Sequence, residues 1–357
     1  MARASAGGVH LRGSRGRAFV GSLALATAVG ATAGCQTPAP PSPSASVSPA
    51  PVWPPGAGPA RIRWLAEVRG PADLGIQPGR LTRLWRWISG SETPRLVRPH
   101  GVAVDARGRL WVADPGARLV HVFDPVRRKY TTIPKRGDAP LLSPVAVTHD
   151  GRGTAYVTDS AAGLIRRFDP DGRSLGDWGR GELVRPTGAA FDSQAGLLWV
   201  VDTGSHKLVV YDEQGHIDRN VGERGSGVGR FNFPTHLTID PRGRLFVTDT
   251  LNFRVQVLSP MGEPLFAFGE AGDGPGALSK PKGVALDRDG HVYVVDGMFD
   301  NVQIFDQEGR VLLHFGERGA GPGQFWLPAG LCIAAGSRIY VADGYNQRVQ
   351  VFEYLGE

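Results

Sequence analysis

The sequence predicts an all-β fold, a six-bladed β-propeller closed by an N-terminal strand, from its composition and from two landmarks that each recur six times. The chain of 357 residues has 50 Gly, 28 Pro and 8 Trp but only 3 Met, which suits short strands joined by turns. A proline precedes an apolar run at Pro99, Pro144, Pro186, Pro234, Pro281 and Pro328. A second apolar run ends at Asp114, Asp159, Asp202, Asp249, Asp296 and Asp343. These aspartates are spaced by 45, 43, 47, 47 and 47 residues, a period typical of propeller blades.

The four strands of one blade can be followed in the fifth repeat. Residues 283–286 (GVAL) form an inner strand without polar side chains, which predicts burial on both faces. The turn at residues 287–290 (DRDG) supplies Asp and Gly where positive φ is needed, and residues 291–295 form the second strand. Residues 302–305 alternate apolar and polar side chains as a half-buried strand does, and residues 311–315 form the outermost strand.

Three stretches carry a family signature: Lys280-Pro281-Lys282-Gly283-Val284-Ala285, residues 315–325 (FGERGAGPGQF) and residues 340–352 (YVADGYNQRVQVF). They resemble the NHL repeat family, and the resemblance covers essentially everything from Arg95 onward. The first three repeats depart from the pattern because their loops are shorter and no Asn and Arg pair follows the aspartate. The resemblance implies six NHL-type blades at residues 95–357 and a role as an interaction platform, although fold does not fix function.

Residues 61–94 are predicted to close and cap the ring. The sixth repeat ends without an outer strand, which leaves an open sheet edge. Residues 61–68 (RIRWLAEV) have the length and apolar content of a strand, so we expect them to pair beside the last strand. Residues 81–88 (LTRLWRWI) place apolar side chains on one helical face and two arginines opposite. They are interpreted as a short capping helix, with a contact to a membrane surface or a partner as the alternative.

Residues 1–35 are interpreted as a lipoprotein-type signal peptide. Four arginines without an acidic residue precede an apolar run at residues 18–33 that is too short and too small-sided for a spanning helix. The run ends in Thr32-Ala33-Gly34-Cys35, which resembles the lipobox of bacterial lipoproteins, although Thr32 stands where an apolar residue is usual. We expect Cys35 to be lipidated and to anchor the chain on the extracytoplasmic side of the cell envelope. The alternatives are a cleaved signal with an incidental cysteine and an uncleaved anchor.

Residues 36–60 (QTPAPPSPSASVSPAPVWPPGAGPA) are predicted to be a disordered tether between lipid and propeller. The segment is built mostly of Pro, Ser and Ala and has almost no charge. Such a composition buries too little apolar surface to offset the entropy of ordering, and its prolines favour an extended conformation.

The charge of the mature chain argues against a nucleic-acid partner. The whole chain has 40 basic and 34 acidic residues, a formal net charge of +6. Cleavage before Cys35 removes four arginines and no acidic residue, which leaves 36 basic residues and a net charge of +2. Phosphate attraction requires a strongly basic surface, so we expect no nucleic-acid partner.

The six aspartates that end the second strands are interpreted as structural. A carboxylate at the same place in every repeat, followed by Gly, Thr, Ser or Pro, is typical of a turn cap that accepts backbone N–H bonds. In the fourth and sixth repeats Arg254 and Arg348 are spaced to bond the aspartate as well. A catalytic group is expected to break the repeat symmetry, and these residues obey it.

His100, His236 and Lys282 break that symmetry at the predicted channel mouth, so they are candidates for ligand contact. His100 directly follows the proline of its repeat, and the equivalent residues are Val145, Thr187, Thr235, Lys282 and Ala329. The family includes a peptidyl-hydroxyglycine lyase with His in Pro-His steps of separate blades, but only Pro99-His100 matches, so no three-histidine zinc site is predicted. The inner strands also lack the carboxylates that hold calcium in lactonase propellers. We predict no metal, no cofactor and no catalytic residue.

Two functions remain open at this point. The first is a non-enzymatic, envelope-anchored binding or scaffold module, a monomeric propeller that binds a protein, peptide or glycan with the loop face around the channel mouth. The alternative is a metal-dependent lyase or lactonase with a divalent metal at the same mouth. A stoichiometric, tightly held metal would favour the second.

Overall fold

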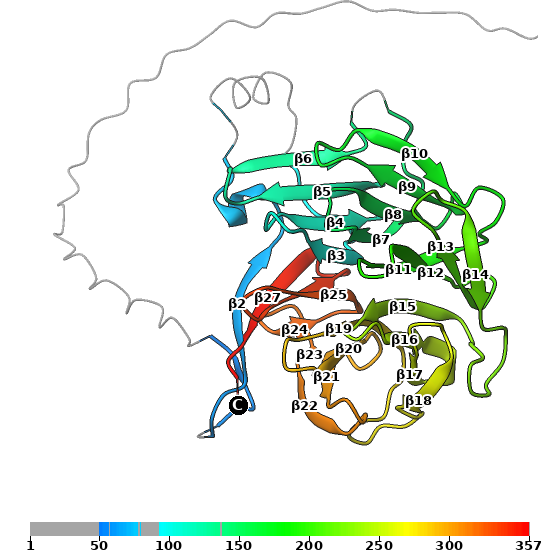
Figure 1. The fold of residues 1–357 in the computed structure, drawn as a ribbon. Coiled ribbons are helices and arrows are strands. Elements are labelled where there is room, and N and C mark those ends of the chain that lie inside the picture. Colours follow the sequence, from blue (N-terminus) through cyan, green and yellow to red (C-terminus); the bar gives the residue numbers. More distant parts are fainter. Residues whose placement is uncertain (1–49, 57, 78, 80–92, 136–137, 357) are drawn as a thin grey trace, which may run out of the picture. The chain divides into compact units, whose positions relative to one another are not determined.

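Strands make up almost all regular structure in the computed structural model, which describes residues 50–356 apart from 57, 78, 80–92 and 136–137 (Figure 1). The described helical segments are two short 3-10 helices, η1 (Pro71–Leu74) and η2 (Thr250–Asn252). Six antiparallel sheets form the six blades of a β-propeller, as the sequence predicts. A short parallel pair, β23 (Glu317–Arg318) and β24 (Gln324–Phe325), lies in the loop between the fifth and sixth blades.

Each of the first five blades has four strands, which follow one another in chain order from the central channel outwards. The first two blades are β3 (Gly101–Val104), β4 (Leu110–Asp114), β5 (Leu119–Asp124), β6 (Lys129–Ile133), then β7 (Pro144–His149), β8 (Ala155–Asp159), β9 (Leu164–Phe168), β10 (Ser174–Trp178). The third and fourth are β11 (Pro186–Asp192), β12 (Leu197–Asp202), β13 (Lys207–Tyr211), β14 (Ile217–Val221), then β15 (Pro234–Ile239), β16 (Leu245–Asp249), β17 (Arg254–Leu258), β18 (Pro264–Phe268). The fifth is β19 (Pro281–Leu286), β20 (Val292–Asp296), β21 (Asn301–Phe305), β22 (Val311–Phe315), and the sixth begins with β25 (Pro328–Ala334), β26 (Arg338–Asp343), β27 (Arg348–Tyr354).

The inner strands of the six blades form a closed ring. They contact one another in chain order, from β3 through β7, β11, β15 and β19 to β25, and β25 contacts β3. A backbone hydrogen bond also joins the sixth blade to the first, because Gly330 N donates to His100 O at 2.8 Å. In a ring of six, blades that are three apart in sequence lie on opposite sides of the channel.

The second strand is the most deeply buried strand of most blades. All five residues of β20 (VYVVD) are buried, and the same is true of β4, β8 and β16. The inner strand is partly exposed in its second half, as in β25, because that half lines a hollow at one end of the channel. The prediction that inner strands are buried on both faces is therefore wrong for their C-terminal halves.

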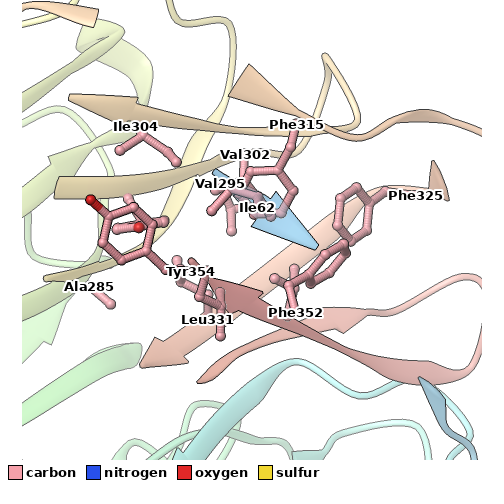
Figure 2. Close-up of a cluster of buried hydrophobic side chains, with 13 residues drawn as sticks. Ile62, Ala285, Val295, Val302, Ile304, Phe315, Phe325, Leu331, Phe352 and Tyr354 are labelled. Carbon is pink, nitrogen blue, oxygen red and sulfur yellow. The ribbon is translucent and has the colours of Figure 1, made fainter. Parts of the chain in front are cut away.

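An N-terminal strand, β2 (Ile62–Val68), closes the ring as predicted. It pairs antiparallel with β27 along its length, and Figure 1 shows β2 in blue alongside β27 in red. The Ile62 side chain is fully buried in a cluster that includes Phe315 of the fifth blade and Phe352 of the sixth (Figure 2). Segments from the two ends of the propeller sequence thus share one hydrophobic core.

A fifth strand, β1 (Val52–Trp53), pairs with β2 at the outer edge of the sixth blade, where Trp53 lies opposite Ile62. The Trp53 ring centroid is 5.8 Å from that of Phe315 and 5.9 Å from that of Phe352. The predicted disordered tether at residues 36–60 is therefore wrong at residues 52–53. The composition argument fails there because one large aromatic ring gains enough contact with the core to order its neighbours.

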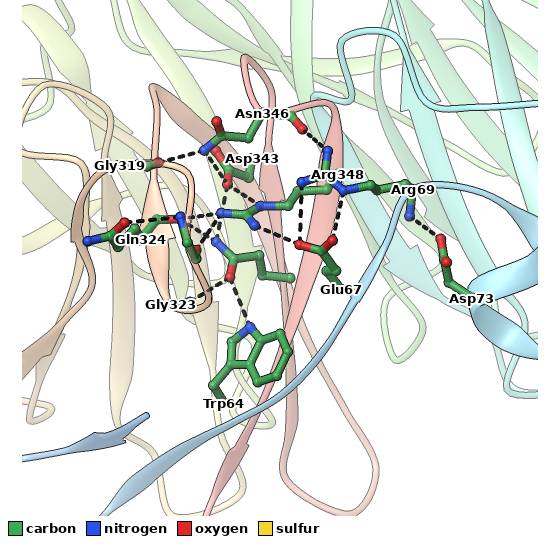
Figure 3. Close-up of polar contacts among 12 residues, drawn as sticks. Trp64, Glu67, Arg69, Asp73, Gly319, Gly323, Gln324, Asp343, Asn346 and Arg348 are labelled. Atoms are coloured by element: carbon green, nitrogen blue, oxygen red, sulfur yellow. Dashed lines mark hydrogen bonds and ion pairs between the residues drawn. The ribbon is translucent and has the colours of Figure 1, made fainter. Parts of the chain in front are cut away.

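A buried arginine ties the closing strand to the sixth blade. The Arg348 side chain is 1% exposed, and its guanidinium donates to Asp343 Oδ2 at 2.8 Å and to Glu67 Oε2 at 2.6 Å (Figure 3). Burial by itself raises the pKa of Glu67, but hydrogen bonds and charges from Arg69 and Arg348 outweigh it and hold that pKa below its usual value. An arginine this deeply buried needs both carboxylates, because an unpaired buried charge is costly.

Several predictions fall outside the described residues. These are the signal peptide at residues 1–35 with its lipidation site Cys35, and the helix at residues 81–88. Within the part of the chain that the structure describes, no helix is long and apolar enough to cross a membrane.

Candidate binding site at the channel mouth

At one mouth of the channel, six buried aspartates join the loop after each second strand to the loop before the inner strand of the same blade. Each is fully buried at the end of a second strand, and it accepts backbone N–H bonds from the loop that precedes the inner strand of the same blade. In the first blade, Asp114 accepts from Val97 at 2.7 Å and from Arg98 at 3.0 Å. The donor two positions before the inner-strand proline recurs in all six blades as Val97, Leu142, Val184, Asn232, Ser279 and Trp326. These carboxylates are thus engaged in holding the mouth together.

In two blades this arrangement is completed by an asparagine before the third strand and an arginine at the start of that strand. Asp249 accepts from Asn252 Nδ2 at 2.7 Å and from Arg254 Nε at 3.0 Å. In the sixth blade Asn346 and Arg348 occupy the equivalent places beside Asp343. The aspartate oxygens of these blades are therefore surrounded by donors, and a metal ion at either place would have to displace them.

In the third, fourth and fifth blades, the first residue after the inner-strand proline faces the first residue after the aspartate. In the third blade the pair is Thr187 and Thr203, whose hydroxyls are 2.6 Å apart. Thr187 also donates to Thr235 O of the fourth blade at 2.8 Å, so these hydroxyls link neighbouring blades. In the fifth blade the pair is Lys282 and Gly297, and a Cβ added to Gly297 would lie 3.1 Å from Lys282 Cε. Glycine therefore leaves room for the lysine stem.

The structure brings the three symmetry-breaking residues together. His100 belongs to the first blade and His236 to the fourth, which lie on opposite sides of the ring. Their imidazole rings nevertheless stack, with centroids 5.5 Å apart and planes inclined by 10°. Lys282 of the fifth blade is close enough for its charge to act on both imidazoles. One mouth of the channel is therefore spanned by a histidine pair with a lysine beside it.

His236 occupies a position at which four of the other five blades have glycine. The equivalents in the first, third, fifth and sixth blades are Gly101, Gly188, Gly283 and Gly330. A Cβ at Gly188 would lie 2.7 Å from His236 Cα, and one at Gly283 would lie 2.7 Å from Ala329 O. The inner strands are thus too close for a side chain at most of these positions, and a histidine here departs from the packing rule of the repeat.

The hydrogen-bonding groups of the histidine pair are largely unused. His236 is 8% exposed, and neither of its ring nitrogens has a hydrogen-bond partner among the described residues. His100 Nδ1 lies 3.3 Å from Val145 O of the second blade. Buried polar atoms usually have a partner, so unpaired ring nitrogens in a channel indicate a position where a ligand atom would be stabilised.

Burial sets the charge of the site. It lowers the pKa of His100 to about 3, with a further decrease from the charges of Lys282 and Arg98. It also lowers the pKa of His236 well below the usual value, and His100 and Lys282 add to the effect. Burial lowers the pKa of Lys282 to about 8, together with the charge of Lys280 and against Asp296 and Asp300. At neutral pH the imidazoles are neutral and Lys282 carries the single positive charge.

Exposed apolar side chains surround this centre, at least one from each blade. They stand two positions before the proline or two positions after the aspartate, at Val97, Leu142, Val184, Leu251, Met298, Trp326 and Tyr345. Val184 is 66% exposed, and the rings of Trp326 and Tyr345 lie 5.5 Å apart. We call these seven residues the apolar ring. None of them is among the candidates predicted from the sequence, although aligning the six repeats on their prolines and aspartates would have identified them.

The other mouth of the channel has a hollow of about 450 Å³. The second halves of four inner strands line it, including Phe191, Thr238, Leu286 and Ile333. The nearby carboxylate of Asp287 accepts backbone N–H bonds of its own hairpin. His149 Nε2, at the same end of β7, is also unpaired, but it stands alone. The stacked histidine pair with a lysine beside it makes the first mouth the better candidate site.

One group of potential metal ligands occurs among the described residues: Asp287, Asp289 and His291 in the hairpin between β19 and β20. Asp287 Oδ2 is already 2.9 Å from His291 Nδ1 and accepts from Tyr293 Oη at 3.1 Å. Two carboxylates and one imidazole fall short of the six or more oxygens that calcium prefers. His100 and His236 are not accompanied by a third such ligand in the described part of the chain.

Comparison with known proteins supports the repeat assignment. A sequence model of the NHL repeat matches residues 96–123, 231–258 and 325–352, which lie in the first, fourth and sixth blades. The chain therefore carries NHL repeats on a six-bladed β-propeller. No curated protein sequence matches the chain.

Solved structures of similar fold have varied functions. Virginiamycin B lyase from Staphylococcus aureus shares 17% identity with a TM-score of 0.54, over 72% of this chain and 96% of that one. An auxiliary nutrient binding protein from Bacteroides thetaiotaomicron shares 13% identity with a TM-score of 0.58, over 73% and 70%. A protein of unknown function from the same organism shares 14% identity with a TM-score of 0.60, over 82% and 75%. At such identities the likeness shows the fold alone.

Proposed function

We propose that this NHL-repeat propeller is a non-enzymatic binding module that holds a protein or peptide partner at the mouth with the histidine pair. A lipid on Cys35 would anchor it to the extracytoplasmic side of the cell envelope, and it would act as a monomer. The observation that carries the proposal is the apolar ring. Seven large apolar side chains are exposed around one channel mouth, where backbone bonds to the buried aspartates hold their loops in place.

The apolar ring favours a macromolecular partner. Single exposed apolar residues are ordinary, but here every blade contributes at least one, at one of two loop positions beside the mouth, so together they form one surface. The adjacent Trp326 and Tyr345 offer the kind of large, rigid side chains that dominate binding energy in protein interfaces. Aromatic faces also suit a glycan, so a glycan partner is a distinct outcome of the test.

Replacing apolar side chains of the ring with a charged one tests this surface. We expect Val184→Asp and Trp326→Asp each to abolish capture of a partner from envelope extract by the immobilised chain, because a carboxylate at a desolvated contact is costly. Val126→Asp is the matched control: Val126 is 81% exposed in the turn between β5 and β6, at the other end of the blade. Equal capture by all three variants would refute the mouth as the binding face. Digestion of the extract with protease or with glycosidase identifies the class of partner.

The alternative, a metal-dependent lyase or lactonase, is tested by metal analysis of the purified chain. His100 and His236 supply two imidazoles, and the buried aspartates at the mouth are engaged with backbone donors. Catalytic zinc takes three protein ligands and calcium takes more. We therefore expect less than stoichiometric zinc or calcium after dialysis. One equivalent that survives dialysis and is lost in His236→Gln would overturn the binding-module proposal.

A further inference from the structure

Lys282 has no counter-ion at the centre of the mouth. Its ammonium has no ion pair or hydrogen bond with the described residues. Its stem packs against Gly297, and the side chain is only partly exposed to water. A cation withdrawn from water without a partner is unfavourable, and a bound anion would offset that cost.

The neighbouring acids do not neutralise this lysine directly. Asp296 accepts backbone N–H bonds from Ser279, Lys280, Met298 and Phe299. Asp300 is 5% exposed, and its Oδ1 accepts from the backbone N–H of Leu327 at 2.6 Å. Both carboxylates are therefore oriented by the loops that they hold.

Three exposed charges that stand next to the inner-strand prolines are basic. Arg98, Arg185 and Lys280 each stand one position before the inner-strand proline of their blades and are exposed. Arg98 and Lys280 face the centre closely enough to lower the pKa values of His100 and Lys282 respectively. These three cations attract anions to the mouth and repel cations from it.

We propose that His100, His236 and Lys282 form a subsite for a carboxylate group carried by an apolar molecule or chain. This inference rests on the proposed function and names the chemistry at its centre. Lys282 provides the ion pair, His236 offers an unpaired ring N–H as a donor, and the apolar ring contacts the body of the ligand.

A monoanion fits the charge of the site. The centre holds one ammonium and two neutral imidazoles, so a carboxylate balances it and a dianionic phosphate leaves an excess negative charge. Phosphate sites usually rely on several cations or on guanidinium groups with paired donors. A divalent cation is disfavoured because Lys282 would repel it and a third ligand is lacking among the described residues.

The test is a titration of the purified full chain, labelled with carbon-13 in its histidine rings, at pH 7.5 and constant sodium chloride. The probe is hexanoate, and hexanamide is the control with the same shape and no charge. We expect hexanoate to cause saturable shifts in two histidine signals, assigned with His100→Gln and His236→Gln. We expect hexanamide to cause none.

Two matched variants locate the interaction. Lys282→Met should weaken hexanoate binding by about tenfold or more, because it removes the charge and keeps the stem. Lys280→Met, which removes an exposed neighbouring lysine, should leave the affinity within about twofold. Gly297→Ala keeps the charge but crowds Lys282 Cε and Cδ, so we expect an intermediate loss.

Three results would overturn the subsite: equal shifts with hexanamide, equal hexanoate affinity in Lys282→Met, or tighter binding of inorganic phosphate than of hexanoate. These titrations do not depend on the partner-capture experiment. Loss of hexanoate binding alone would leave the apolar ring as a docking surface, whereas retained capture by Val184→Asp would remove the docking surface and leave the subsite.

Discussion

Truncation of Ile62 to alanine tests how far the ring depends on its N-terminal strand. Ile62 is fully buried between the fifth and sixth blades (Figure 2). The change removes three carbon groups at about 0.8 kcal/mol each, or about 2.4 kcal/mol before any cavity term. Incomplete relaxation around the cavity raises the expected loss to about 2–5 kcal/mol. Leu65→Ala is the matched control, because Leu65 lies on the same strand with 36% of its surface exposed, and we expect less than about 1 kcal/mol.

The assay is urea unfolding at 25 °C followed by tryptophan fluorescence. A two-state fit gives the free energy of unfolding, and an unchanged slope would confirm that only stability has changed. Deletion of residues 1–70 is the stronger form of the experiment, since it removes β1 and β2 together. If Ile62→Ala and Leu65→Ala lost the same small amount, or the deletion left the midpoint unchanged, β2 would not be closing the ring.

Three further changes have defined outcomes. Glu67→Gln should cost about 1–2 kcal/mol in urea unfolding because it leaves Arg348 with one carboxylate, whereas Glu353→Gln, in an exposed pair, should cost less than about 0.5 kcal/mol. The pKa of His236 is lowered in the folded chain, so stability is lost as the pH falls below the unfolded value near 6.5. Between pH 7.5 and pH 5 the free energy of unfolding should decrease by about 2 kcal/mol less in His236→Phe than in the unchanged chain. Cys35→Ala should abolish metabolic labelling with a fatty acid and release the chain from the membrane fraction, and retained labelling would refute lipidation.

The repeat determines how much of the fold can be predicted. A proline and an aspartate that keep one register through six copies place every strand to within a few residues, and the missing outer strand of the sixth copy indicates that Ile62 and its neighbours must supply it. Trp53 could not be placed in the same way. Its strand has two residues within a proline-rich segment, and its order depends on a pocket between Phe315 and Phe352 that exists only after the ring closes.

The site was predictable in its members but not in its geometry. His100, His236 and Lys282 stand out as departures from the repeat, yet the first and fourth copies are separated by more than a hundred residues. Counting blades would have shown that copies three apart face each other across a ring of six. The stacking of the two rings, and the absence of partners for His236 among the described residues, could not be obtained that way because they depend on how far each side chain reaches into the channel.

The ionisation of the site also separates the two candidate functions. A general base works best when its pKa lies near the working pH. The pKa of His100 is lowered to about 3 and that of His236 falls well below the usual value, so neither imidazole takes up a proton at neutral pH. A lyase at this mouth would therefore have to use Lys282, whose pKa is lowered to about 8, and its rate would rise as the pH increases through that value. Binding of a carboxylate has the opposite dependence, because the ion pair is lost as Lys282 loses its proton. A hexanoate affinity that falls between pH 7 and pH 9 would thus support recognition over catalysis, and an affinity that rises would contradict it.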